Sequence, residues 1–170
     1  TRNELVQNLI PIVSSYYQAI AQTSEMIEIF YRSEYEKALI KESYLDLLAK
    51  SYETDLAAGN TTLGPQRDDL QFFLGQKNMQ NFASRGEWRS LVLALKFAEI
   101  ELLKQKHGKA PLLLLDDVFS ELDEGRQNYL LHSLADIQTF ITTTHPIFFN
   151  ELNLPYQLYE VEEGEIKIKA

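Results

Sequence analysis

The segment LLLLDDVFSELD, residues 112–123, decides the fold, because an apolar run ends there in two adjacent carboxylates. Four consecutive leucines after Pro111 predict a strand covered on both faces, as in a mainly parallel sheet. Ligands of such sheets collect at the carboxyl ends of the strands, where Asp116 and Asp117 stand. The segment therefore predicts an acidic site at the edge of an α/β sheet.

Asp116 and Asp117 are expected to have different tasks, because neighbouring side chains of an extended strand point in different directions. One carboxylate can hold Mg²⁺ while the other orients a water, which is a recurring pair in phosphoryl transfer. The plainer interpretation, an acidic loop after a core strand, also fits so short a motif. A second motif is needed to choose between them.

Ser84-Arg85-Gly86-Glu87 is that second motif, because it comes directly before a strongly amphipathic stretch over residues 88–103. Ser84 and Glu87 satisfy the capping-box pattern of a helix start. Such a start also offers unpaired N–H groups, and Gly86 lets a phosphate approach the backbone without a Cβ in the way. The motif predicts a helix start that either serves as a plain cap or binds a phosphate.

The order of these motifs resembles the carboxyl-terminal half of an ABC-type ATPase head. SRGEWRS, LLLLDD and SELD begin at residues 84, 112 and 120, with a helical stretch between the first two. GPQRDDL at 64–70 and LALKFAEIELL at 93–103 make the chain resemble the RecF family more than other SMC-like ATPases. The likeness is strongest over residues 61–144. Arg85 and Glu87 replace glutamines common in the family, and Gln66 stands where histidine is frequent.

The resemblance implies an α/β fold with two parts. Residues 61–170 would form the carboxyl-terminal lobe of an ABC-type ATPase head, and residues 1–60 a helical insert subdomain. The implied cofactors are ATP and Mg²⁺. Asp116 would then hold Mg²⁺ through its water shell. Asp117 would polarise the attacking water, with a shorter side chain than the Glu of most ABC-type ATPases.

The resemblance also implies a composite nucleotide site between two copies of the protein. The residues that match the family signature would contact the γ-phosphate of ATP held by the opposite subunit: Ser84, Arg85, Gly86 and Glu87. Ser120 and Asp123 match a loop that crosses the dimer interface.

Three further residues have more than one possible role. Thr144 and His145 follow the next predicted strand and compete for the switch position of the family. Arg67, beside Asp68 and Asp69, either forms a buried ion-pair turn or contacts the nucleotide site.

The partners follow from the resemblance alone: gapped or single-strand/double-strand junction DNA, a RecR-like mediator and an ATP-dependent homodimer, in the cytoplasm. A net charge of −9 and a pI near 4.8 do not predict DNA binding, which normally needs a basic face. A basic group over residues 104–109 is a local exception, but it also suits the dipole at a helix end.

No G-x-x-x-x-G-K-[ST] loop occurs among the seven glycines. Gly108-Lys109-Ala110 lacks the terminal hydroxyl residue and cannot form that loop. We therefore expect the chain to be the carboxyl-terminal part of a longer protein and to be inactive as an ATPase by itself. There is no cysteine, and no apolar run approaches the ~20 residues of a membrane span, so neither a disulfide nor a membrane helix is expected.

Two other functions fit the same residues. The chain can be a non-catalytic interaction module that uses its acidic surface and helical insert to hold a partner. Alternatively, Asp116 and Asp117 can serve a metal-dependent phosphatase, which needs further ligands that converge on the metal.

The remaining sequence predicts secondary structure at both ends of the chain. Helical spacing over residues 5–20 includes Pro11, which marks either a helix start or a kink. The other predictions are a strand at 26–32, a helix at 35–58, a strand at 138–142, and a hairpin of 156–161 with 165–169 that finishes the sheet.

Overall fold

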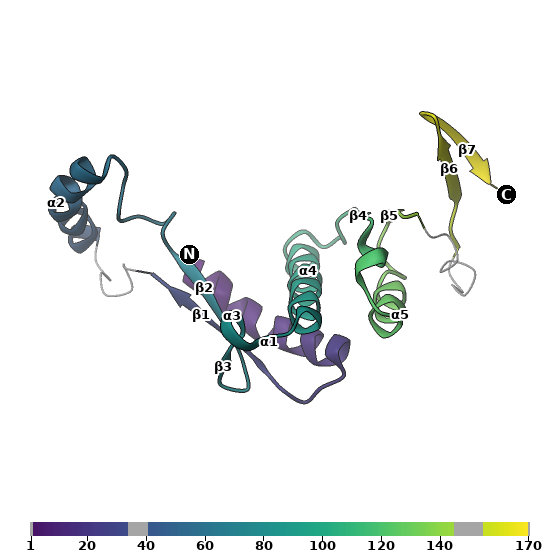
Figure 1. Ribbon diagram of the computed structural model, residues 1–170, viewed down its shortest axis with the longest axis horizontal. Helices are drawn as coiled ribbons and strands as arrows, with labels where there is room; N and C mark the ends of the chain where they lie inside the picture. Colours follow the sequence, from purple (N-terminus) through teal and green to yellow (C-terminus); the bar gives the residue numbers. More distant parts are fainter. Residues whose placement is uncertain (1, 34–40, 145–154, 170) are drawn as a thin grey trace. The chain divides into compact units, whose positions relative to one another are not determined.

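The computed structural model describes residues 2–33, 41–144 and 155–169, and it has a mixed α/β architecture (Figure 1). The chain divides into two compact units, Thr1–Leu102 and Leu103–Ala170. Within the first unit, residues 27–32 pair with residues 69–74. Segments from both sides of the boundary predicted at residue 60 therefore belong to the same compact unit. Among the described residues, no helix combines the length and the apolar character needed to cross a bilayer.

The first unit is built on three antiparallel strands in the order β1-β2-β3. They are β1 (Ile27–Arg32), β2 (Asp69–Leu74) and the short β3 (Lys77–Asn78). The register pairs Ile27 with Leu74 and Arg32 with Asp69. The strand predicted over 26–32 is thereby confirmed.

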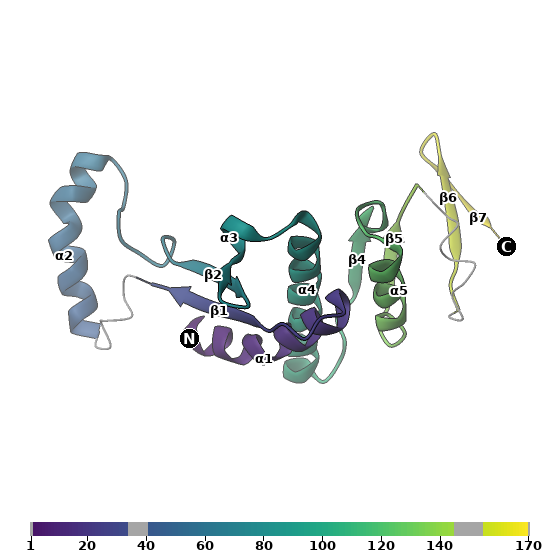
Figure 2. The ribbon, with the colours of Figure 1, turned by 60° about the horizontal axis from the view of Figure 1, so that its bottom comes forward.

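Helix α1 (Arg2–Ala21) runs through Pro11 as one element, so the helix does not begin at that proline. It lies along β1 in both views (Figures 1 and 2). Its buried side chains include Val13 and Tyr17, and β1 buries Ile27 and Ile29. The core of the first unit therefore lies between α1 and the strands.

Helix α4 (Arg85–His107) adds a second apolar surface to this core. Leu91, Ala94 and Phe97 are buried, and Phe97 stacks on Tyr16 of α1 with ring centroids 5.4 Å apart. The helix predicted after the SRGE motif is confirmed. The described unit also contains α2 (Lys41–Ala58) and the single turn α3 (Met79–Phe82). The residues before Lys41 in the predicted 35–58 helix lie outside the described residues.

The second unit contains a parallel pair, β4 (Leu113–Asp116) with β5 (Thr139–Thr142). A 3₁₀ turn (Val118–Glu121) and helix α5 (Glu124–Ser133) connect the two strands. Strands β6 (Leu158–Glu162) and β7 (Glu165–Lys169) form an antiparallel hairpin. Both predicted strands that flank the connection and both strands of the hairpin are present.

Two predictions about this unit are wrong for the described residues. The leucine strand is not covered on both faces: Leu114 is 69% exposed and its partner Phe140 is 55% exposed. The reason is that this sheet has two strands, and no element among the described residues covers the face that carries Leu114 and Phe140. The hairpin also does not finish that sheet, since β6 and β7 pair only with each other.

Candidate functional site

The carboxyl ends of β4 and β5 meet in register at Asp116 and Thr142. The Thr142 hydroxyl donates a hydrogen bond of 2.5 Å to Oδ1 of Asp116. The backbone N–H of Asp117 donates to both the carbonyl oxygen and the Oγ1 of Thr142, each at 3.1 Å. The parallel pairing therefore places a hydroxyl directly against the acidic end of the leucine strand.

Asp117 leaves the strand with φ 46° and ψ 28°, in the left-handed region. This conformation is unfavourable for most side chains, but Asp and Asn adopt it more readily than the rest. The Ser120 hydroxyl contacts the Asp117 carbonyl oxygen at 2.8 Å and its Oδ2 at 3.0 Å. The two adjacent carboxylates are thus held by different hydroxyls.

Asp123 caps helix α5. Its side chain accepts a hydrogen bond of 3.0 Å from the N–H of Arg126 and forms an ion pair with the Arg126 guanidinium. A cap of this kind contributes about 1 kcal/mol. Asp123 was expected only at the dimer interface, although an Asp three residues before a helical N–H is a known cap signal.

Gln127 holds the 3₁₀ turn onto α5. Its side-chain amide donates to the carbonyl oxygens of Phe119 at 2.8 Å and Leu122 at 2.9 Å, and the residue is buried. Phe119 is buried beside it. The segment after Asp117 is consequently anchored at both ends, which fixes where Ser120 and Asp123 lie. Nothing in the spacing of the sequence pointed to Gln127.

In the first unit, the start of α4 forms the expected capping box. Ser84 N–H donates to Oε2 of Glu87 at 2.6 Å, and Glu87 N–H donates to Oγ of Ser84 at 3.2 Å. These bonds to Ser84 hold the pKa of the Glu87 carboxyl below its usual value. Where the family has a neutral glutamine, this helix start therefore carries a negative charge at neutral pH.

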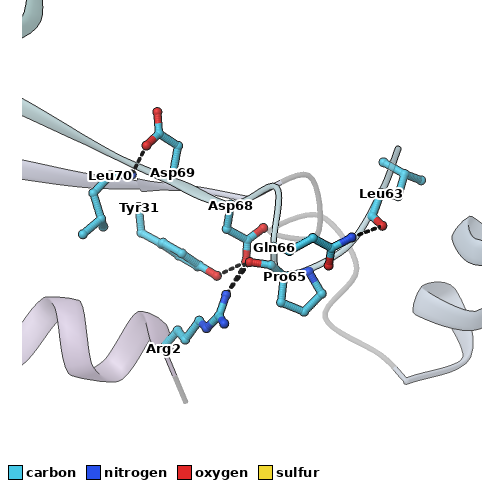
Figure 3. Close-up of polar contacts among 8 residues, drawn as sticks. All are labelled: Arg2, Tyr31, Leu63, Pro65, Gln66, Asp68, Asp69 and Leu70. Atoms are coloured by element: carbon cyan, nitrogen blue, oxygen red, sulfur yellow. Dashed lines mark hydrogen bonds and ion pairs between the residues drawn. The ribbon is translucent and has the colours of Figure 1, made fainter. Parts of the chain in front are cut away.

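The GPQRDDL segment forms a hydrogen-bonded loop before β2. Arg67 donates to the carbonyl oxygen of Thr61 and to Oδ1 of Asn60, at 2.8–3.0 Å. Gln66 donates to Oγ1 of Thr61. It also donates to the carbonyl oxygen of Leu63 (Figure 3). Arg67 is exposed and bonds backbone and amide oxygens, which does not match the alternative of a buried ion-pair turn around Arg67. Its contact with the nucleotide site stays a prediction.

Asp68 carries a buried carboxylate in this segment. Its side chain is 6% exposed, and its Oδ2 accepts from the Tyr31 hydroxyl and lies 3.5 Å from Nη1 of Arg2 (Figure 3). Arg2 also donates to the carbonyl oxygen of Pro65 at 2.5 Å. The bond from Asp68 is the main cause that raises the pKa of the Tyr31 hydroxyl. This cluster ties the first turn of α1 to the end of β1.

The predicted site residues fall into two groups, one in each unit. Asp116, Asp117, Ser120 and Asp123 gather around the ends of β4 and β5. The signature residues and Arg67 belong to the first unit. Thr144 is exposed two residues after Thr142, and His145 lies outside the described residues. Thr142, which was not among the predicted site residues, donates the hydrogen bond to Asp116.

The acidic end of β4 offers oxygen ligands of the kind that Mg²⁺ binds. Among residues 2–33, 41–144 and 155–169, no three His, Cys, Asp or Glu side chains converge as a metal-binding group. Mg²⁺ beside a nucleotide does not need such a cage, since one or two carboxylates, phosphates and waters suffice. Asp116 fits that role because it is exposed and one of its oxygens is already oriented. When bound, Mg²⁺ would neutralise developing phosphate charge.

Comparisons with known proteins identify the relatives of the chain. No protein-family model matches it. It is 40% identical over 175 residues to the DNA replication and repair protein RecF of Streptococcus equi subsp. zooepidemicus, and 38% identical over 177 residues to that of Halalkalibacterium halodurans. The chain is a homologue of RecF. These matches cover 99% of the chain and 47–48% of the relatives, so it spans about half of their length and corresponds to the carboxyl-terminal portion of RecF.

Solved structures of RecF support the same relationship. One described as the recombination mediator protein RecF-ATPrS in the RecFOR pathway matches 99% of the chain and 46% of its own length, with a TM-score of 0.79 and 29% identity. A RecF-ATP structure matches with the same TM-score and 30% identity. An SMC ATPase structure, at 13% identity and a TM-score of 0.55, shows likeness of fold alone. The RecF resemblance and the α/β fold of an ABC-type head expected from the motifs are confirmed.

Proposed function

We propose that this chain supplies the signature helix and the acidic strand end of a RecF-type recombination mediator ATPase. The observation that carries the proposal is the strand end at Asp116 and Asp117, where two hydroxyls orient adjacent carboxylates separately. The homology to RecF over nearly the whole chain makes ATP the expected nucleotide. The phosphate-cradling loop would come from the part of the protein that corresponds to the other half of RecF.

Asp116 and Asp117 would divide the hydrolytic work. Asp116 would hold Mg²⁺ through its water shell, with Oδ1 fixed by Thr142. Asp117 would orient the attacking water, while Ser120 holds its Oδ2. Positioning of this kind supplies most of the catalysis in phosphoryl transfer, because the protein has little covalent chemistry to perform. Thr144 or His145 would serve as the switch residue that reads the γ-phosphate.

The start of α4 would approach the nucleotide of a second subunit. The dipole of the helix favours an anion at this end, and Ser84, Arg85 and Gly86 are the residues nearest it. Glu87 opposes a phosphate at this place, and Arg85 would offset its charge. Ser120 and Asp123 would lie at the interface of the ATP-dependent homodimer. Arg67 would stabilise the loop before β2 and would add positive charge near the site.

The biological role would be to support recombinase loading on gapped or single-strand/double-strand junction DNA, together with a RecR-like mediator, in the cytoplasm. The support is the RecF homology and the RecFOR pathway named for the solved relatives. The net charge of −9 does not favour a broad electrostatic grip on DNA, so the DNA contacts would be confined to local basic groups.

A second candidate function is a protein-interaction module, and the β6–β7 hairpin favours it. One face carries four exposed apolar side chains in cross-strand pairs, Tyr159 with Ile168 and Val161 with Ile166. The other face carries ion pairs, for example Lys169 with Glu160 at 2.6 Å. A two-stranded hairpin is marginally stable alone in water, so a covering surface would stabilise it.

The Asp117→Asn variant tests the ATPase proposal in a full-length RecF-type protein that contains this chain. Asn keeps the size of the side chain but cannot take a proton from water. We expect the variant to form ATP-driven dimers, measured by sedimentation, and to lose ATP turnover. Hydrolysis at the parent rate would remove Asp117 from its role. Failure of the parent itself to dimerise or hydrolyse ATP would favour the interaction module.

A further inference from the structure

Thr142 makes three hydrogen bonds to Asp116 and Asp117, although it lies 26 and 25 residues after them in the chain. Its hydroxyl donates to Oδ1 of Asp116 at 2.5 Å. The same oxygen accepts from the N–H of Asp117 at 3.1 Å. Its carbonyl oxygen accepts from that N–H as well, also at 3.1 Å. One residue of β5 thus contacts both residues of the acidic pair.

The direction of the hydroxyl proton follows from these partners. The Asp117 N–H can only donate, so it occupies a lone pair of the Thr142 oxygen. An ionised Asp116 carboxylate can only accept, so it takes the single hydroxyl proton. Hydrogen bonds to a charged group are shorter and stronger than neutral ones, and 2.5 Å lies at the short end of that class. The carboxylate of Asp116 is therefore held in one orientation.

We propose that Thr142 is a positioning residue for the metal-holding carboxylate of Asp116. By occupying Oδ1, the Thr142 hydroxyl leaves Oδ2 of Asp116 to face the waters of Mg²⁺. The Asp117 N–H bonds both the hydroxyl and the carbonyl oxygen of Thr142, and these two bonds fix the backbone position from which the second carboxylate extends. This inference rests on the proposed ATPase function and adds a residue to it. Thr142 acts through Asp116 and Asp117 and touches neither nucleotide nor metal.

The predicted effect is a change in metal dependence. Residues that orient a metal ligand typically change metal affinity by 10–100-fold when replaced. Thr142 is exposed and makes a single bond to the ligand, so we expect the lower end of that range, about tenfold. The affinity for ATP in the absence of Mg²⁺ should be unchanged, because the nucleotide itself does not contact Thr142.

The experiment compares four full-length RecF-type proteins that contain this chain: the parent, Thr142→Val, Thr142→Ser and Thr139→Val. Val keeps the β-branched shape and removes the hydroxyl, whereas Ser keeps the hydroxyl. Thr139→Val is the matched control, since it removes a hydroxyl from the same strand that bonds only the Ile137 carbonyl oxygen, at 2.9 Å. Thermal unfolding of each protein checks the fold, and Thr142→Ala replaces Thr142→Val if that variant unfolds.

The readouts are the Mg²⁺ concentrations that half-saturate ATP-driven dimerisation and ATP hydrolysis. The proposal expects Thr142→Val to need about tenfold more Mg²⁺ in both assays, with Thr142→Ser and Thr139→Val close to the parent. An unshifted Thr142→Val beside a parent that responds to ATP overturns the role of Thr142 and leaves the ATPase proposal standing. A parent that responds to ATP in neither assay overturns both, and this failure is visible without any variant.

Discussion

The strand pairs β1–β2 and β4–β5 differ in how well they are covered. In β1, Ile27 and Ile29 are 1% and 5% exposed, because α1 packs against that face. In β4, the more uniformly apolar strand, Leu114 is 69% exposed. Four leucines in a row therefore identify a strand but do not show that both faces are covered. Coverage depends on which other elements the described chain brings to each face.

The start of α4 and the acidic end of β4 also differ in the contacts that hold their predicted site residues. The start of α4 is fixed by a local capping box between Ser84 and Glu87, three residues apart. The acidic end of β4 depends instead on Thr142, which is distant in sequence. Local patterns were readable from the sequence, and the long-range contact was not.

Substitution of one strand residue in each pair tests the difference in coverage. Ile29→Ala removes a side chain from the core beside α1, and we expect it to lower the free energy of unfolding by about 2–4 kcal/mol. Leu114→Ala removes an exposed side chain and should change it by less than about 0.5 kcal/mol. Urea denaturation of the chain measures both values. Equal losses for the two variants would show that the face of β4 is covered in solution.

The next largest expected loss of stability comes from removal of the buried carboxylate of Asp68. Asp68→Ala leaves the Tyr31 hydroxyl and the Arg2 guanidinium without their shared partner, at a cost of about 2 kcal/mol. Asp69→Ala is the matched control, because its exposed side chain bonds the N–H of the next residue, Leu70, and should cost less than about 0.5 kcal/mol. Denaturation midpoints at equal slope give the comparison. A similar loss in both variants would contradict the special position of Asp68.

The capping box is expected to contribute about 1 kcal/mol to the free energy of unfolding through Ser84, which denaturation of Ser84→Ala measures.

The bond that Glu87 makes in the capping box is also pH-dependent. The folded pKa of Glu87 lies below its ordinary value of 4.5, so this stabilisation is present above that value and is lost as the pH falls through the folded pKa. Glu87→Gln should therefore reduce the stability difference between neutral and acidic pH. An unchanged pH dependence would argue against the capping bond.

Tyr31 gives the smallest effect, a shift in titration. Its pKa is raised from 10.0 by the Asp68 bond, so any stabilisation linked to it persists below pH 10 and is lost as the pH rises through the folded pKa. The ultraviolet titration of tyrosinate in the parent, minus that of Tyr31→Phe, should show one group above the ordinary value. A difference curve centred at the ordinary value would mean that the Asp68 bond does not persist in solution.

The sequence was sufficient for much of the fold and for the motifs, for physical reasons. Capping boxes, helical spacing and a turn between alternating segments are local, and the helix after Ser84 and the hairpin at Glu162–Glu165 were predicted from them. The resemblance to RecF came from several ordered motifs and was confirmed by the homology.

The contacts between distant segments were not predictable in the same way. The Arg2–Asp68 pair joins residues 66 positions apart, and the register of β4 with β5 decides that Thr142 meets Asp116. Thr144 and His145 were selected from the sequence because the switch residue of the family follows this strand. Thr142, the last residue of the strand itself, was not selected. The nucleotide roles of Ser84, Arg67, Thr144 and His145 remain predictions.

The central claim is that Asp117 and Ser84 act in one ATP site made by two subunits. Asp117→Asn lacks the water-orienting carboxylate, and Ser84→Arg blocks the signature, so each full-length variant alone should hydrolyse no ATP. Mixing them pairs a Ser84→Arg subunit, whose Asp117 is intact, with the intact signature of an Asp117→Asn subunit. The account predicts that ATP hydrolysis returns in the mixture. A mixture no more active than its separate components would contradict it.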